Sequence, residues 1–166
     1  MLKNRDTNYD DQIVTRLADF NNPSDTSAIV DLIDHYAQDP MGGGKPLLEE
    51  VRQRMTKGMA KMPGSFVVLA SIGENYVGCA TCFMGFSTFK AMPLVNIHDL
   101  CVHKDWRNRG VGNALLEVVA QEAIHRGCCK VTLEVRDDNP AKRLYERCGF
   151  KSVDVAMWFL HKDLVS

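Results

Sequence analysis

Apolar residues recur along the chain with two different spacings, which predict strands and helices in alternation. Residues 13–17 are expected to form a first strand. The next apolar positions have the three- and four-residue spacing of a helix face: Ile29, Leu32, Ile33 and Tyr36. Ser24 or Asp25 would cap this helix, and a second helix is expected over about residues 46–61.

The middle of the chain has the composition of a β-hairpin followed by a strand and a helix. Residues 66–72 and 76–86 are β-branched and apolar, and Gly73-Glu74-Asn75 lies between them as a turn. A further apolar run at residues 94–102 predicts another strand, and residues 111–126 form a long amphipathic stretch.

The C-terminal part repeats this alternation on a shorter scale. Residues 130–135 are β-branched, as in a buried strand. Asn139-Pro140 combines an N-cap residue with proline at the first helical position, which predicts a short helix that ends near Gly149. Residues 153–160 offer one or two more short strands. The resulting order, β-α-α-β-β-β-α-β-α-β, places the chain in the α/β (α+β) class.

Composition and charge narrow the class of protein. The 166 residues, 45% of them hydrophobic, fit a single domain over residues 1–166. A net charge of −1 gives no global basic field, which argues against a nucleic-acid partner. Residues 1–11 are polar and charged, unlike a secretory signal, and no apolar run could span a bilayer. We therefore expect a cytoplasmic protein that does not contact membranes.

The six cysteines are expected to be reduced thiols, because no export signal is present. Cys79 and Cys82 have the spacing of a zinc or redox pair, but they lie within a predicted strand. Residues three apart in a strand point to opposite faces, so we expect buried packing and no metal.

The segment Arg107-Asn108-Arg109-Gly110-Val111-Gly112 joins a predicted strand to a predicted helix. Free N–H groups and the dipole at a helix N-terminus bind anions, and glycines let a phosphate approach the main chain. A dinucleotide-binding fingerprint would need glycine where Leu115 stands, and a Walker loop would need Ser or Thr where Pro46 follows Gly44-Lys45. The sequence therefore predicts a different diphosphate-binding loop.

The pattern Arg-x-x-Gly-x-Gly, followed by a strand and then by Asn139, Leu144-Tyr145 and Gly149-Phe150, resembles the GNAT superfamily of N-acetyltransferases over residues 94–151. The resemblance implies a GNAT fold, with a mixed and mostly antiparallel sheet of about six to seven strands flanked by about four helices. It also implies acetyl-CoA as co-substrate.

The resemblance implies where acetyl-CoA binds. The strands that end at Val102 and begin at Lys130 would splay apart, and the pantetheine arm would pair with the main chain between them. The cofactor-binding residues expected on this basis are Leu100, Cys101, Val102, Arg107, Asn108, Arg109, Gly110, Val111, Gly112, Asn113, Asn139 and Lys142. Asn139 has a simple N-cap role as a compatible alternative.

Acetyl transfer to an amine needs a base for the amine and an acid for the departing thiolate. Tyr145 occupies the position of the tyrosine that serves as the acid in the family; its alternative is a core aromatic residue. Phe86-Ser87-Thr88-Phe89 adds a local similarity to diamine acetyltransferases, which carry a Glu-Asp pair where this chain has His98-Asp99. His98 is thus the expected base, or a structural histidine, and Asp99 a substrate anchor or a structural carboxylate.

Strict alternation would place His98 and Asp99 on opposite faces of their strand, unless a bulge intervenes. Residues 42–44, a glycine tract between the first two helices, would help to shape the acceptor pocket or would form a flexible connection. The expected function is acetylation of a primary amine on a small molecule such as a polyamine, an amino-acid analogue or an aminoglycoside. A peptide or protein acceptor and a non-catalytic acyl-CoA-binding module are the alternatives. Family members are often dimeric, which makes a homodimer a candidate assembly.

Overall fold

A five-stranded sheet forms the centre of the computed structural model, which describes residues 12–152, 160, 162 and 164. Its strands follow one another across the sheet in chain order, and the first three pairings are antiparallel. Only the last pairing is parallel. The strands are β1 (Ile13–Leu17), β2 (Phe66–Ile72), β3 (Asn75–Ser87), β4 (Met92–Val102) and β5 (Val131–Leu133).

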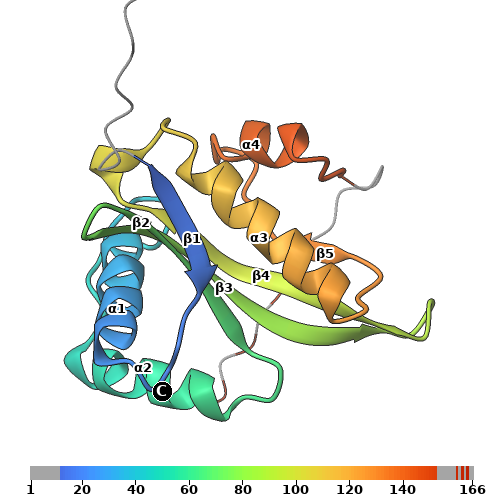
Figure 1. Cartoon of the computed structure of the whole chain (residues 1–166), viewed down its shortest axis with the longest axis horizontal. Helices are drawn as coiled ribbons and strands as arrows, with labels where there is room; N and C mark the ends of the chain where they lie inside the picture. The colour runs from blue at the N-terminus through green and yellow to red at the C-terminus, as the bar shows by residue number, and fades with distance from the viewer. Residues whose placement is uncertain (1–11, 153–159, 161, 163, 165–166) are drawn as a thin grey trace, which may run out of the picture.

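Helices cover both faces of this sheet (Figure 1). One face packs against α1 (Pro23–Ala37) and α2 (Glu49–Lys61), and the other packs against α3 (Val111–His125) and α4 (Lys142–Arg147). A short 3-10 turn, η2 (Lys104–Trp106), leads from β4 towards α3. The expected mixed, mostly antiparallel α/β fold with four helices is confirmed.

The described residues contain five strands, so the expected count of six to seven is wrong for this part of the chain. The further strands expected at residues 153–160 fall almost entirely outside the described residues.

Each face of the sheet has its own hydrophobic core. On the α3 face, Val111, Leu115 and Val119 pack against alternate residues of the strands. On the α1 face, Ile29 and Leu32 do the same. The interior strand β2, which lies between β1 and β3, is therefore buried along nearly its whole length. Fully burying one aliphatic side chain is worth about 1.5–3 kcal/mol, so these two layers hold the helices in place.

Cys79 and Cys82 belong to different cores, which confirms that the two thiols point to opposite faces of β3. Cys79 lies on the α1 face, where its Sγ is 3.1 Å from the Sγ of Cys101 on β4. Burial raises the pKa of the Cys82 thiol to about 12, as expected for a packing residue rather than a nucleophile.

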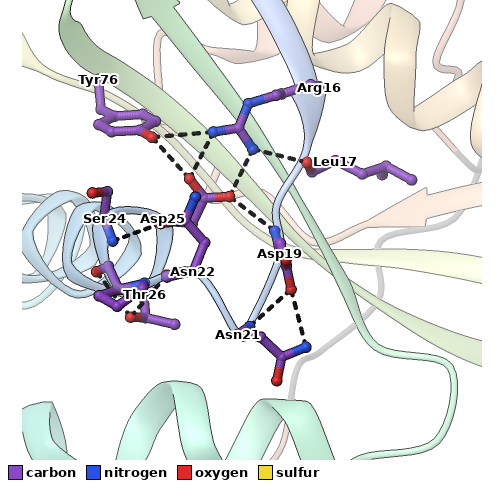
Figure 2. Close-up of polar contacts among 10 residues, drawn as sticks. Arg16, Leu17, Asp19, Asn21, Asn22, Ser24, Asp25, Thr26 and Tyr76 are labelled. Atoms are coloured by element: carbon purple, nitrogen blue, oxygen red, sulfur yellow. Dashed lines mark hydrogen bonds and ion pairs between the residues drawn. The ribbon is translucent and has the colours of Figure 1, made fainter.

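The start of α1 differs from the sequence prediction, because the cap is Asn22 rather than Ser24 or Asp25. The Asn22 side chain accepts a hydrogen bond of 2.9 Å from the Ser24 N–H, and Pro23 occupies the first turn. Asp25 has a different task. Its buried carboxylate accepts two hydrogen bonds of 2.6 Å from Arg16 on β1 and one of 2.8 Å from the Tyr76 hydroxyl on β3 (Figure 2).

This cluster joins the start of α1 to two strands, and so fixes where the rest of the helix lies. Hydrogen bonds from the Arg16 guanidinium hold the pKa of Asp25 well below its usual range, and the Asp19 N–H and the Tyr76 hydroxyl add to the shift. Buried carboxylates are tolerated only when they are paired in this way.

Other boundaries also differ from the predictions, most of them by one or two residues. α2 begins at Glu49 rather than Pro46, because the Asp34 carboxylate binds the Leu47 N–H and keeps the preceding residues extended. β5 is shorter than residues 130–135. α4 begins at Lys142, because Asn139 first forms a turn in which its side chain accepts from the Ala141 N–H at 2.9 Å.

The strand β4 contains a bulge at His98, which changes the faces expected from strict alternation. Thr81 of β3 pairs with Asp99, whereas the next residue, Cys82, pairs with Ile97. Ile97 therefore faces α3, while Cys101 faces α1. Strict alternation therefore fails here and the bulge that was its alternative is present, because one inserted residue reverses the side of every position beyond it.

Candidate active site

A gap opens between β4 and β5. The two strands pair only from Val95 to Ile97 and from Val131 to Leu133, and residues 98–102 of β4 extend beyond the last pair. The expected divergence of these strands is confirmed. The main chain of residues 98–102 therefore has no β5 partner on this side, and an extended ligand could bind it as a strand would.

The hydrogen bonds of β4 indicate which main-chain groups face the gap. The N–H groups of Asp99 and His103 point to β3, where they bind the Thr81 Oγ1 and the Val77 carbonyl oxygen. Because alternate residues of a strand point to opposite edges, Leu100 and Val102 present their N–H and C=O groups to the gap. By the same argument, the N–H and C=O groups of Cys101 point to β3.

The gap leads to the N-terminus of α3, which no side chain caps. Gly110 precedes the helix with φ 90°, and Asn108 also has a positive φ of 62°. The first intrahelical bond runs from the Ala114 N–H to the Gly110 carbonyl oxygen at 3.0 Å. The N–H groups of residues 111–113 thus lack helical acceptors, and the first turn contains no acidic residue. This chemistry suits an anion.

Three cationic side chains expected near the phosphates have different surroundings. The Arg109 guanidinium stacks on the Trp106 ring, 4.8 Å from its centroid. Arg107 and Lys142 are each in an ion pair, with Asp39 at 2.8 Å and with Asp137 at 2.9 Å. To bind a phosphate, either of these two would have to exchange or share its carboxylate partner.

Tyr145 lies half-buried on α4 and packs edge-to-face against Phe150, with 5.8 Å between the ring centroids. Burial raises the pKa of Tyr145 to about 12, and the nearby Tyr36 contributes. Tyr36 belongs to α1 on the opposite face of the sheet.

His98 and Asp99 lie on the α1 face, because the bulge brings both polar side chains to one side. The exposed His98 ring meets the Phe83 ring edge-to-face, with 5.7 Å between centroids. The Asp99 carboxylate is half-buried and accepts from the Thr81 hydroxyl at 2.7 Å through one oxygen, Oδ2. Oδ1 has no hydrogen-bond donor among the described residues and is free to bind a cation.

Gly112 and Asn113 contact α4 and its C-terminal end. A Cβ at Gly112 would lie 2.8 Å from the Cδ2 of Leu144, so α4 sits directly against the first turn of α3. The Asn113 side chain adds a second contact, because it accepts from the Cys148 thiol at 3.2 Å. These contacts place α4, which carries Tyr145, next to the first turn of α3.

The structure adds two residues that sequence reasoning did not select. Tyr36 served only as an apolar helix position in the pattern, yet its hydroxyl lies within electrostatic reach of both Asp99 and Tyr145. Burial raises the pKa of Tyr36, and Asp99 adds to this shift. Asp39, which pairs with Arg107, is 68 residues distant in sequence, and no local signal joins them.

A separate hollow lies beside α1. It has a volume of about 730 Å³ and is lined mainly by polar side chains of α1, together with Arg52, Tyr76 and His103. Among the described residues, no group of three or more His, Cys, Asp or Glu side chains could hold a metal ion. No helix in this part of the chain is long and apolar enough to cross a membrane.

Comparisons with known proteins agree with this architecture. An acetyltransferase of Pectobacterium atrosepticum is 45% identical over 56 residues, which are 33% of this chain and 40% of the relative. The chain therefore spans less than half of that protein.

Two solved structures share the fold at low sequence identity. A ribosomal-protein-alanine N-acetyltransferase from Brucella melitensis biovar Abortus superposes with a TM-score of 0.71 at 19% identity, over 91% of this chain and all of the other. An aminoglycoside acetyltransferase from an uncultured soil sample, in complex with sisomicin, superposes with a TM-score of 0.74 at 15% identity, over 92% and 97%. The model of the acetyltransferase (GNAT) family matches residues 29–150, and this chain therefore belongs to that family.

Proposed function

We propose that the chain transfers the acetyl group of acetyl-CoA to the primary amine of a small molecule by direct attack. The observation that carries the proposal is the gap beyond Ile97, where β4 has no β5 partner and the uncapped α3 N-terminus lies at its end. A thioester on a long arm with a diphosphate matches both features.

In this proposal the main chain binds most of the cofactor. The N–H groups of residues 109–113 hold the diphosphate, with the Arg109 guanidinium beside them. The N–H and C=O groups of Leu100 and the N–H group of Val102 align the pantetheine arm, while the Val102 carbonyl oxygen keeps its hydrogen bond from Arg107. One of these N–H groups stabilises the developing oxyanion. Asn139 also belongs to the proposed cofactor contacts.

Tyr145 is the proposed general acid. A phenol whose pKa is raised to about 12 keeps its proton across the physiological range, which is the state needed to protonate a departing thiolate. His98 is the proposed base, acting directly or through water, because an imidazole titrates near neutral pH. Asp99, with its free oxygen on the same face, is proposed to anchor the cationic acceptor.

The acceptor is proposed to be a small amine, with a peptide amine as the second candidate. The Brucella and soil-sample enzymes, which act on a ribosomal protein and on an aminoglycoside by their names, represent both classes. The half-buried Asp99 favours the first class, because a single carboxylate beside the gap can hold a compact cation.

The test measures release of the coenzyme A thiol from acetyl-CoA with a panel of amines: spermidine, lysine, sisomicin and a peptide with N-terminal alanine. One amine should support turnover, and Tyr145→Phe should lower kcat with it by about ten- to a thousandfold. Binding of coenzyme A, measured by calorimetry, should stay within about twofold, because a hydroxyl that acts late adds little to ground-state binding. Coenzyme A binding without turnover on any amine would instead favour an acyl-CoA-binding module. A Tyr145→Phe variant as active as the wild type would remove the residue from this role.

A further inference from the structure

The Arg107 side chain is occupied by contacts with the Asp39 carboxylate and with the main chain of β4. Its Nη2 donates to the Asp39 Oδ2 at 2.8 Å, and its Nε donates to the Val102 carbonyl oxygen at 3.2 Å. The Asp39 side chain is only 19% exposed, so this ion pair is partly shielded from water. A phosphate that took Arg107 away would leave a shielded carboxylate without its cation, which is unfavourable.

Asp39 organises the loop between α1 and α2. Its carbonyl oxygen accepts hydrogen bonds from Gly42, Gly43 and Gly44 at 2.8, 3.1 and 3.1 Å. Its Oδ1 accepts a fourth, of 2.9 Å, from the Met41 N–H. One residue thus sets the fold of the glycine tract, and the other oxygen of the same carboxylate binds Arg107.

A second contact fastens the end of α1 to the same stretch of chain. The Lys104 N–H donates to the His35 Nε2 at 3.2 Å, and the His35 and His103 rings stack with 4.2 Å between centroids. The segment that follows β4 is therefore joined to α1 by His35 and to the loop after α1 by Asp39.

The loop that Asp39 folds touches the acceptor side of the gap. Tyr36 lies three residues before Asp39, and its hydroxyl is 3.5 Å from the Met41 carbonyl oxygen in the loop. A Cβ at Gly42 would lie 2.0 Å from the Tyr36 carbonyl oxygen, so the glycine packs directly against the helix end. A shift of this loop would therefore displace Tyr36, which packs against the α1-face core that contains Cys101 of β4, two residues beyond Asp99.

We propose that Arg107 is a positioning residue, which acts through Asp39 to hold residues 39–45 and Tyr36 in the shape that receives the acceptor. Arg109 and the main-chain N–H groups then supply the contacts to the cofactor's phosphates. The proposal rests on the proposed acetyltransferase function. It assigns the two arginines of the Arg-x-x-Gly-x-Gly motif to different partners.

The test compares Arg107→Gln, Asp39→Asn and the double variant with Arg109→Gln. Arg107→Gln and Asp39→Asn should each raise KM for the best amine of the panel by about tenfold. The double variant should raise KM by no more than about a further twofold, because both substitutions break the same ion pair. The dissociation constant of coenzyme A should stay within about twofold in these variants, whereas Arg109→Gln should raise it by about fivefold or more.

Hydrogen exchange at the amides of residues 42–44 gives a readout that needs no acceptor. Exchange should become faster in Arg107→Gln and Asp39→Asn, and should be unchanged in Arg109→Gln. The proposal is overturned if Arg107→Gln weakens coenzyme A binding as much as Arg109→Gln does, or if the loop amides exchange at the wild-type rate. If the wild type acetylates no amine, the proposed function fails, while calorimetry and exchange still decide the role of Arg107.

Discussion

A carboxylate placed in the first turn of α3 should stabilise the protein and weaken its cofactor binding at once. Asn113 is the third residue of this helix, is exposed, and lies in a turn that has neither a side-chain cap nor an acidic residue. Asn113→Asp changes one NH₂ group into O⁻ and keeps the oxygen that accepts from Cys148. The substitution therefore adds charge with almost no change in shape.

The two effects have opposite signs because the same N–H groups are involved in both. A negative side chain in the first turn of a helix typically adds about 0.3–1 kcal/mol to stability. Two unit charges about 6 Å apart repel by about 0.7 kcal/mol in water, and more beside protein, so a doubly charged diphosphate should bind about 1.5–3 kcal/mol more weakly. This corresponds to an increase of about ten- to a hundredfold in the dissociation constant of coenzyme A.

Calorimetry with coenzyme A and urea unfolding measure the two effects separately. Gln121→Glu adds the same charge to an exposed position two turns further along α3, and it should change the dissociation constant by less than about twofold, because salt screens charges at that distance. The binding loss in Asn113→Asp should shrink in 1 M salt for the same reason. A variant that gains stability but binds coenzyme A as the wild type does would show that the diphosphate lies away from this turn.

Two more predictions concern the contacts that hold the site. Asp25→Asn should lower the free energy of unfolding by about 2–3 kcal/mol, because the bidentate contact to Arg16 is lost from a buried site. Because the Asp25 pKa is depressed in the folded state, its contribution to the free energy of unfolding is complete above the ordinary carboxyl pKa of about 4 and declines as the pH falls further. Urea titrations at several pH values should show that the variant loses this acid dependence. Gly112→Ala should lower the unfolding free energy by about 1 kcal/mol although alanine favours helices, and adding Leu144→Val should recover part of it; a stabilised Gly112→Ala would mean that α4 does not press on this turn.

The order of elements could be predicted because each long element carries its own apolar period. β1 and β2 have the predicted bounds, and α3 differs by one residue at its C-terminus. The two Asn-Pro pairs show the limit of local signals. Asn22 and Asn139 each accept a hydrogen bond of 2.9 Å from the N–H two residues on, but only the first pair leads directly into a helix. The difference lies in the next segment of each, because α1 has a buried face that packs on the sheet whereas no residue of α4 is fully buried.

The glycine-containing start of α3 could be predicted because glycines and an uncapped helix start are local properties. The acceptor side of the gap depends on contacts between distant segments. The bulge at His98 has no signal in the strand itself, and it depends on how β3 and β4 pair. Asp39 precedes the β2–β3 hairpin in the sequence and Arg107 follows it, so only the folded chain brings the two partners together. The motif predicts a phosphate-binding role for Arg107, and the sequence gives no sign of its carboxylate partner.

The bulge in β4 and the short β5 together determine which candidate catalytic side chains lie on each face of the sheet. Because β5 pairs with only three residues of β4, the edge of β4 beyond Ile97 has no strand partner among the described residues. The bulge then turns His98 and Asp99 towards the α1 face, while Tyr145 approaches from α4 on the other. An acceptor held by Asp99 and a thiol leaving towards Tyr145 would thus lie on opposite sides of the scissile bond, as direct attack requires. A regular strand at residue 98 would have placed only one of the two polar side chains on the acceptor side.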